Sequence, residues 1–347
     1  MNCPPCKRSP GIRRQRGAAL IVALLVFALC AALIAAMQGE LTRVYQRGAN
    51  LFLAEQGYAY LRGAEDLAAL ALLLDYDQDD AQQRQRDDLG EIWARPATPY
   101  ALDEGGYLQG SLEDLQGRFN LNALVGRAPA GADTADRPRF TPAQAQFIRL
   151  LQVLEDPPVS QQQAIALTES IGDWLDGNTV AGRDGAEDDY YVTLTPAYRS
   201  ANAPMASVSE LRAVAHMTPD IYRALRPWVT VWPREPGTLN IHTAPPAVLR
   251  SINADDDLSP LSESEVQMLL AQRSESGFAD VEDFLASPVF AERQADMQGI
   301  RALLGEQSCC FLLDATVKVA ERNLHLYSVL ERRQRSVRAL ARSTGSL

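Results

Sequence analysis

One stretch of this 347-residue sequence limits the fold more than any other: twenty residues, Ala18 to Met37, carry no charge. As a helix they rise ~30 Å, which matches the hydrocarbon core of a bilayer. Glu40 follows the run, and five basic residues precede it, namely Lys7, Arg8, Arg13, Arg14 and Arg16. Because basic residues favour the cytoplasmic side, the sequence predicts a single-pass helix over 18–37 with a cytoplasmic N-terminus.

Other kinds of targeting segment explain this run less well. The apolar part of a removable signal peptide is usually only ~7–15 residues long, and no A-x-A cleavage site follows this run. A lipoprotein signal ending before Cys30 would need a small residue where the chain has Leu29. A simple signal anchor remains open from these physical arguments alone.

The residues around Gly17 resemble the class III signal of type IV pilins and type II secretion pseudopilins. The shared features are a basic leader ending in glycine, then Ala-Ala-Leu-Ile-Val and an unbroken apolar helix. The resemblance implies that a prepilin peptidase removes residues 1–17 by cutting between Gly17 and Ala18, and that Ala18 is then methylated. Most such proteins have glutamate at the fifth mature position, where this chain has Val22. In lacking this glutamate, the chain resembles the general secretion pathway protein K family, whose members are large minor pseudopilins.

The rest of the chain predicts an α+β fold. Apolar residues continue at near-helical spacing beyond the membrane run. The stretch GGYLQGSLEDLQGRFNLNAL predicts two short strands around Glu113 and Asp114, and strand patterns return from Cys309 onward. Short helical patterns fill the chain between about 140 and 304, several opening with serine, threonine or aspartate caps.

These patterns predict a pilin-like long helix packed on a small antiparallel sheet, with a large all-helical inserted domain of helix-hairpin-helix or SAM-like type. The predicted segments are the leader 1–17, the membrane helix 18–37, the pilin-like helix and first strands 38–122, the inserted domain 123–305 and the closing strands 306–347. This arrangement also resembles protein K.

The acidic stretch that begins at Asp75 imitates a calcium loop. Asp75, Asp77 and Asp79 match the start of an EF-hand, but the sixth position is Asp80 instead of glycine and the twelfth is Arg86 instead of glutamate. The sequence therefore predicts a solvated acidic turn that ends the long helix.

A second acidic stretch, residues 173–202, is a stronger candidate for a metal site. Six carboxylates fall within seventeen residues, and Arg183 is the only basic residue among them. The stretch has no cysteine or histidine, so its oxygen donors favour Ca²⁺ over softer metals. The alternative is a solvated acidic loop, although four large rings argue against a loose one: Trp174, Tyr190, Tyr191 and Tyr198.

This acidic stretch also resembles the calcium segment of protein K, which implies a structural Ca²⁺ ion. The first candidates for ligands are Asp173, Glu187, Asp188 and Asp189, and the further candidates are Asp176, Asp184 and Asn202. The spacing assigns no individual ligand. Because crowded carboxylates repel one another, Ca²⁺ binding is expected to be linked to folding of the segment.

The alternative function is nucleic-acid binding by a membrane-anchored periplasmic protein. The stretch TLNIHTAPPAVLRSINADDDLSP resembles helix-hairpin-helix modules, which hold phosphate with the backbone N–H groups of a glycine-rich hairpin. Here the hairpin has no glycine and carries Asp255, Asp256 and Asp257. The net charge of −11 also opposes binding to a polyanion, so no nucleic-acid partner is expected.

The sequence predicts no enzyme and no redox centre. It has no G-x-S-x-G elbow, P-loop or glycine-rich dinucleotide turn. Cys3 and Cys6 form a CPPC without a thioredoxin-like context. Cys309 and Cys310 are adjacent, and one peptide holds their Cα atoms too close for a relaxed disulfide.

The resemblance to the protein K family implies a structural role in secretion. It implies a minor pseudopilin of the inner membrane, with its body in the periplasm, that caps the pseudopilus tip with minor pseudopilins I and J and supports the export of folded proteins. Partners would contact it mainly along the helix from Glu40 to Leu74.

Overall fold

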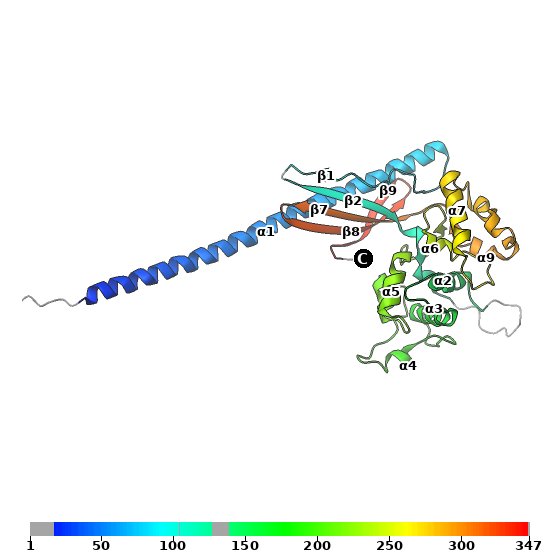
Figure 1. Ribbon diagram of the computed structural model, residues 1–347, viewed down its shortest axis with the longest axis horizontal. Coiled ribbons are helices and arrows are strands. Elements are labelled where there is room, and N and C mark those ends of the chain that lie inside the picture. The colour runs from blue at the N-terminus through cyan, green and yellow to red at the C-terminus, as the bar shows by residue number, and fades with distance from the viewer. Residues whose placement is uncertain (1–16, 104, 127–138, 346–347) are drawn as a thin grey trace, which may run out of the picture. The chain divides into compact units, whose positions relative to one another are not determined.

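The computed structural model describes residues 17–103, 105–126 and 139–345, so the predicted leader, apart from Gly17, lies outside the described residues. The chain divides into two compact units, one ending at Tyr58 and one beginning at Ala59. Helix α1, Ala18–Gln82, contributes residues to both units (Figure 1).

In the first unit, α1 has the length and composition of a membrane span. Its most apolar eighteen-residue window has a mean hydropathy of 3.0, and none of that window is buried. Large apolar side chains such as Leu20 and Phe27 are exposed. A helix that is apolar on all sides needs an apolar surrounding, and within the described residues only α1 meets this test.

In the second unit, five antiparallel strands form a sheet in the order β1-β2-β7-β8-β9 (Figure 1). The strands are β1 Tyr100–Ala101, β2 Gly106–Asp114, β7 Cys310–Val319, β8 Arg322–Arg333 and β9 Ser336–Ser343. Strands β2 and β7 pair along their whole length, with Leu112 opposite Leu313. The prediction that the sheet begins near residue 107 and closes after residue 309 is confirmed.

The second half of α1 is held to this sheet by polar as well as apolar contacts. Leu61 and Leu72 are fully buried. Glu65 accepts hydrogen bonds from Ser328 Oγ at 2.6 Å and from Arg342 Nε at 2.7 Å. The helix therefore joins β8 and β9 through a buried carboxylate.

Two local predictions for this region are wrong. The helix runs through the first eight residues of the acidic stretch that was expected to end it, and it stops only where Gln83 takes a φ of 53°. Asp75, predicted to be solvated, is only 4% exposed. The cause is tertiary: Arg332 of β8 pairs with the Asp75 carboxylate at 3.0 Å and stabilises the extra helical turns.

The strand prediction around Glu113 and Asp114 is also wrong in detail. One nine-residue strand, β2, ends at Asp114, and a 3-10 turn, Leu115–Gly117, follows it. Burial alternates along β2 because one face covers the core, and Asp114 then accepts from Gln116 N at 2.8 Å to start the turn. The second strand is reduced to β3, Phe119–Asn120.

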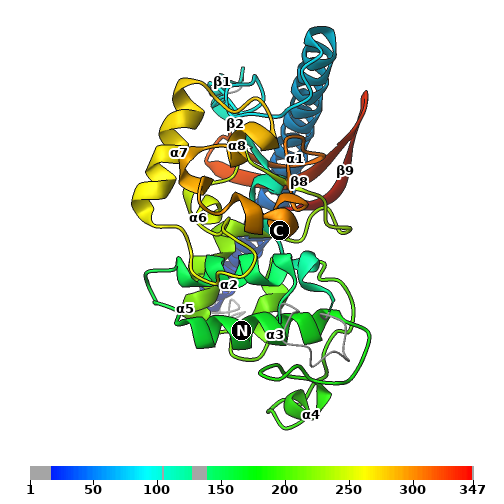
Figure 2. The same cartoon turned by 90° about the vertical axis from the view of Figure 1, so that its right-hand side faces the viewer.

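The segment between the two halves of the sheet is mainly helical. Its helices are α2 Pro142–Gln152, α3 Gln161–Leu175, α4 Asp188–Tyr191, α5 Pro219–Leu225, α6 Pro246–Leu249, α7 Glu263–Glu275, α8 Val281–Leu285 and α9 Gln298–Arg301. Short 3-10 turns are Leu121–Leu124, Val208–Ala213, Arg226–Trp228, Pro288–Phe290 and Gln294–Asp296. Figure 2 shows α2 and α3 side by side, with α4 at the end furthest from the sheet.

The expectation of an all-helical insertion needs a correction. Two short parallel pairs interrupt it: β3 pairs with β4, Val229–Thr230, and β5, Leu239–Asn240, pairs with β6, Leu304–Gly305. The predicted caps are confirmed at Thr141 and Ser262, each with a reciprocal capping box, and Ser160 caps α3 in the same way. One apolar core joins α2, α3, α7 and α8 through buried residues that include Phe147, Ile171, Leu269 and Phe284.

Candidate functional site

The predicted cleavage point lies at the start of α1. Ala18 is the first helical residue, and the Gly17 carbonyl accepts hydrogen bonds from Leu20 N at 3.1 Å and from Ile21 N at 3.2 Å. Val22 is exposed on this helix, so the chain presents an apolar side chain where a carboxylate is typical of pilins. The basic residues that precede Gly17 lie outside the described residues.

The predicted metal segment runs from the end of α3, through α4, to residue 202. A frame of packed rings shapes it: Tyr191 lies 5.3 Å from both Trp174 and Tyr198 between ring centroids. Tyr191 is fully buried, and its hydroxyl accepts from Ala215 N at 3.1 Å. These contacts hold both ends of the segment in a packed frame, while residues 177–181 between them are exposed.

Three of the predicted ligands meet at Ser200. Its Oγ lies 2.9 Å from Glu187 Oε2, 3.1 Å from Asp188 Oδ1 and 2.9 Å from Asn202 Oδ1. A serine hydroxyl has one proton to donate, so it can satisfy only one of these three oxygens at a time. The backbone N–H of Ser200 also donates to Asp188 Oδ1 at 3.0 Å.

Glu187 has a further oxygen atom without a hydrogen-bond donor. Glu187 is only 1% exposed, and its Oε1 has no hydrogen-bond partner among the described residues. Burial is the main cause that raises the pKa of Glu187, and the charges of Asp176 and Asp188 add to it. A buried acceptor without a donor is costly, whereas a hard cation that takes oxygen ligands would satisfy it. The residues therefore fit a Ca²⁺ ion.

A second group of carboxylates surrounds the end of α3. Asp173 is 4% exposed, and its Oδ2 accepts from Gly182 N at 2.8 Å. Asp184 pairs with Arg139 at 2.6 Å, and Arg139 also pairs with Glu169 at 2.7 Å. Arg139 is close to two carboxylates of the second group, whereas the guanidinium beside the Ser200 oxygens, that of exposed Arg199, lies 3.7 Å from Asp188 Oδ2, so the second group fits a cation less well.

The remaining predicted ligands lie outside both groups. Asp176 caps the end of α3, where its Oδ1 accepts from Asn178 Nδ2 at 2.6 Å. Asp189 is exposed, and its Oδ1 accepts from the backbone N–H of Tyr190 at 2.9 Å. The hydrogen bonds thus bring Glu187, Asp188 and Asn202 together at Ser200 and place Asp173 and Asp184 in the second group, while the charge of Asp176 acts on Glu187.

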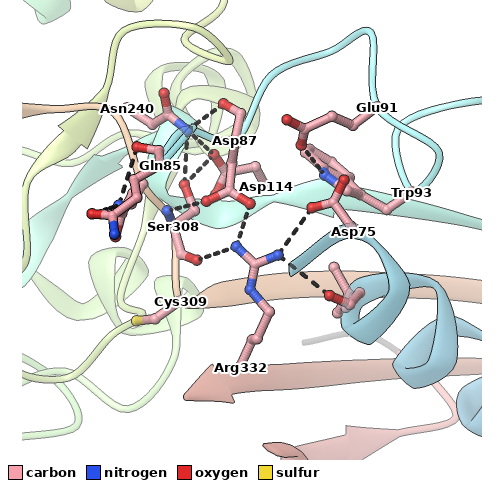
Figure 3. Close-up of polar contacts among 12 residues, drawn as sticks. Asp75, Gln85, Asp87, Glu91, Trp93, Asp114, Asn240, Ser308, Cys309 and Arg332 are labelled. Atoms are coloured by element: carbon pink, nitrogen blue, oxygen red, sulfur yellow. Dashed lines mark hydrogen bonds and ion pairs between the residues drawn. The ribbon is translucent and has the colours of Figure 1, made fainter. Parts of the chain in front are cut away.

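A second cluster of buried carboxylates lies where α1, the sheet and the inserted segment meet; we call it the junction cluster (Figure 3). The Arg332 guanidinium lies between Asp75 and Asp87 and pairs with both. Asp114 accepts from Thr243 Oγ1 at 2.5 Å, Ser308 Oγ at 2.6 Å and Asn240 Nδ2 at 3.2 Å. The members are Asp75, Asp87, Glu91, Asp114, Asn240, Thr243, Ser308 and Arg332.

The junction cluster has spacing suitable for a metal but also has its own cation. Asp75, Asp87 and Glu91 each place an oxygen within 4.8 Å of the others. Burial raises the pKa of Asp75 to about 6 against the opposing effect of Arg332, and burial together with the Asp75 charge raises that of Glu91 to about 8. Because a guanidinium and several N–H and O–H donors face these oxygens, they are satisfied by the chain itself.

Sequence reasoning did not identify the junction cluster or Ser200. The partners in the cluster are far apart in the chain, with 257 positions between Asp75 and Arg332. Two members of the cluster, Asn240 and Thr243, lie in the stretch TLNIHTAPPAVLRSINADDDLSP. That stretch resembles helix-hairpin-helix modules, and this resemblance is a sequence signal near the cluster. Ser200 had no comparable signal, since a single serine between Arg199 and Ala201 matches no metal-binding pattern.

The aspartates of the helix-hairpin-helix-like stretch bind neighbouring backbone groups. Asp255 accepts from Gly299 N at 2.6 Å and from Ile300 N at 2.7 Å. Asp257 accepts from Ser259 N at 2.8 Å. These carboxylates use N–H groups of the kind that hold phosphate in the DNA-binding modules, so their position adds to the charge argument against that function.

Comparisons with known proteins agree on one family. Two family models, both described as "Type II secretion system (T2SS), protein K", match residues 117–234 and 239–302, together more than half of the chain. The chain is 33% identical to the type II secretion system protein K of Pseudomonas aeruginosa, over 96% of this chain and 94% of that protein. It is 31% identical to the corresponding protein of Aeromonas hydrophila, over 93% and 95% of the two chains.

A solved structure also matches. It is a chain in the crystal structure of the GspK-GspI-GspJ complex from the type 2 secretion system of enterotoxigenic Escherichia coli. The match has a TM-score of 0.71 and 28% identity, and it covers 87% of this chain and 100% of that chain. The comparisons give no support to nucleic-acid binding.

Proposed function

Because this chain belongs to the type II secretion system protein K family, we propose that it caps the tip of a periplasmic pseudopilus as a minor pseudopilin. The relatives carry the names of a secretion-system component, and the chain is not an enzyme. The observation that carries the tip role is the match to a chain of the GspK-GspI-GspJ complex. By analogy, minor pseudopilins I and J are its partners, and the complex supports export of folded proteins.

The exposed side chains of α1 support this assembly. Between Glu40 and Leu74, large apolar residues such as Tyr45, Leu51 and Phe52 are exposed. Exposed apolar side chains on a helix favour packing against other helices. Val22 supports a terminal position, because a chain without a carboxylate there offers no charge partner to the N-terminal amine of a subunit above it.

The same proposal places α1 in the inner membrane after processing. The prepilin peptidase would cut between Gly17 and Ala18 and methylate Ala18, leaving the N-terminus cytoplasmic and the body periplasmic. Intact-mass measurement of the membrane-expressed chain, with and without co-expressed prepilin peptidase, tests this. A loss equal to residues 1–17 is expected only with the peptidase, and an uncut chain would contradict the proposal.

Co-purification tests the tip role directly. The full chain is expected to co-purify with minor pseudopilins I and J, and Leu51→Asp with Phe52→Asp is expected to reduce recovery of both partners. Asn50→Asp is the matched control, because it adds a negative charge at an exposed polar position of the same segment. Equal recovery with both variants would contradict contact along this helix.

A structural Ca²⁺ ion is the second part of the proposal. The oxygens of Glu187, Asp188 and Asn202 around Ser200 support it, since one hydroxyl proton serves three acceptors there. The ion would hold α4 to the loop that follows it, and its binding would add to the free energy of unfolding. Titration with Ca²⁺ after chelation should raise the melting temperature, and an unchanged melting temperature would contradict the site.

The inserted segment provides the third part. We infer that residues 239–302 are of helix-hairpin-helix type with the phosphate-binding role lost, which the carboxylates of Asp255 and Asp257 support through their bonds to backbone N–H groups. A measurable affinity for duplex or single-stranded DNA at physiological salt would contradict this part.

A further inference from the structure

Two adjacent thiols lie at the start of β7. The Sγ atoms of Cys309 and Cys310 are 3.4 Å apart. Both side chains pack against the same small apolar cluster, which includes Leu115 and Val329. Successive side chains of a regular strand point to opposite faces, so the chain departs from regular strand geometry here and brings the two sulfurs into contact.

The two thiols differ in their access to solvent. Cys310 is 0% exposed, whereas Cys309 is partly exposed and lines a polar cavity of about 430 Å³ with Gln85, Gln116 and Arg332. Figure 3 shows the Cys309 sulfur turned away from the Arg332 guanidinium. A small reagent that enters this cavity therefore meets Cys309 first.

The thiol contact also makes Cys309 the better nucleophile. A hydrogen bond from Cys310 lowers the pKa of the Cys309 thiol, while donating that bond, together with burial, raises the pKa of Cys310. The thiolate is the form that attacks a disulfide. Access and ionisation both select Cys309 for the first step.

We propose that Cys309 and Cys310 form a reversible thiol–disulfide exchange site for small disulfides such as oxidised glutathione. The Cys309 thiolate attacks one sulfur of glutathione disulfide, forming a mixed disulfide and releasing one glutathione thiolate, which takes up the Cys309 proton. Cys310 then gives up its proton and attacks the Cys309 sulfur, closing a Cys309–Cys310 disulfide and releasing the second glutathione. Glutathione disulfide is the oxidant, and it gains the two electrons that the two cysteines lose.

The backbone hydrogen bonds around Cys309 affect how easily this disulfide is reduced. The Cys309 N–H donates to Gln116 Oε1 at 2.6 Å, and the Cys309 carbonyl accepts from Arg332 N at 2.7 Å. Adjacent Cα atoms are ~3.8 Å apart, below the usual range of a relaxed disulfide. Closing the ring must therefore rotate the peptide between the two cysteines and strain the hydrogen bond to the Cys309 carbonyl, and a strained disulfide is easily reduced.

Oxidation would thus weaken the junction cluster. Ser308, the residue before Cys309, donates its N–H to Asp87 Oδ2 at 2.7 Å and its hydroxyl to Asp114 Oδ2 at 2.6 Å. The Cys309 carbonyl that the rotation moves accepts from the backbone N–H of Arg332, whose guanidinium pairs with Asp75 and Asp87 in the same cluster. The periplasm, where the proposed function places this site, is an oxidising compartment, so exchange there would couple its redox state to the link between the sheet and the inserted segment.

The test follows the two thiols of the purified, reduced full chain after addition of oxidised glutathione. Peptide mass mapping should find loss of two hydrogens in the peptide that contains both cysteines, reversed by dithiothreitol. In Cys310→Ser or Cys310→Ala, glutathione should accumulate on Cys309. In Cys309→Ser, the native chain should react at Cys310 at least about tenfold more slowly than the wild type reacts at Cys309.

Two controls keep the outcome decisive. In denaturant, Cys309 of Cys310→Ser and Cys310 of Cys309→Ser should react at similar rates. Each variant must also show the wild-type melting temperature within a few degrees before its native rate is compared. The oxidised wild type should melt below the reduced wild type. Equal native rates at the two positions, or a stable glutathione adduct that Cys310 never displaces, would overturn the proposal and leave the role in secretion untouched.

Discussion

Two regions of this protein are rich in carboxylates, and they differ in how many hydrogen-bond donors and cationic side chains face the carboxylate oxygens. In the junction cluster, Arg332 pairs with Asp75 and Asp87, and hydroxyl and amide donors surround Asp114. Around Ser200, one hydroxyl faces three oxygens, and Glu187 Oε1 has no partner among the described residues. The number of donors, more than the number of acids, thus separates a cluster that the chain itself satisfies from one that could accept a cation.

Removing the internal cation should have the largest effect. Arg332→Ala leaves Asp75 and Asp87 buried without their ion pair, and breaking a buried pair from one side costs ~3–5 kcal/mol of the free energy of unfolding. Denaturant unfolding of the full chain in detergent measures this. Arg335→Ala is the control, because its pair with Asp77 is exposed and should contribute only ~0–1 kcal/mol.

An Arg332→Ala variant as stable as Arg335→Ala would contradict the role of Arg332 as the cation of the junction cluster. It would mean that the junction carboxylates are neutralised by protons or by an external ion, as proposed for the oxygens around Ser200. Repeating the unfolding with added Ca²⁺ separates these two cases, since only an external ion makes the stability depend on the cation concentration.

The next largest effect concerns the external cation. Glu187→Gln should remove most of the Ca²⁺-dependent gain in stability, which for a ligand at 100 times its Kd is ~2.7 kcal/mol. Melting temperature with Ca²⁺ and with chelator measures the gain. Asp189→Asn should keep it, because Asp189 is exposed and lies outside the oxygens around Ser200.

The same comparison explains which parts of the molecule could be predicted from sequence. The membrane-length helix, the closing strands and the capped helices follow from local patterns, and their prediction is confirmed. Asp75 was wrongly predicted to be solvated because its partner, Arg332, lies on a strand near the other end of the chain. Tertiary pairing of this kind leaves no trace in local spacing.

The candidate site was predictable in composition but not in geometry. Acid density pointed to residues 173–202, and the structure then places three of the predicted ligands at Ser200 and one, Asp184, at Arg139. Neither Ser200 nor Arg139 was expected to take part. A ligand set depends on which donors already serve each oxygen, and that requires the fold.

Substitution of Gly185 tests the second group of carboxylates, which surrounds the end of α3. A Cβ at Gly185 would overlap Asp173 Oδ2, and moving this buried carboxylate would break its bond from Gly182 N. Gly185→Ala should therefore cost ~1–2 kcal/mol, within the range for overpacking. Gly177→Ala is the matched control, because nothing lies within 4 Å of a Cβ at that position.

If Gly185→Ala also removed the Ca²⁺ dependence of the melting temperature, the comparison would sharpen. The two groups of carboxylates would then be linked in binding, although the structure separates their hydrogen bonds. A loss of stability with an unchanged response to Ca²⁺ would confine the cation to the oxygens around Ser200.

The smallest expected effect is a dependence on pH that the junction cluster should have. Burial and the charge of Asp75 raise the pKa of Glu91 from 4.5 to about 8, so the folded chain holds this proton more strongly than the unfolded chain. The stabilising contribution is therefore complete below the unfolded value and is lost as the pH rises through about 8. Glu91→Gln should remove this loss, since glutamine stays neutral and can still accept from Trp93 Nε1.

Unfolding of the wild type and of Glu91→Gln across this pH range measures the effect as a difference. We expect the variant to gain roughly 1 kcal/mol relative to the wild type at the alkaline end and to match it at the acidic end. The magnitude is modest because Glu91 is only partly buried, so solvent screens much of the cost of its charge. A constant difference at every pH would mean that Glu91 keeps its charge when folded, and that the donors around the junction satisfy all of its carboxylates in their ionised form.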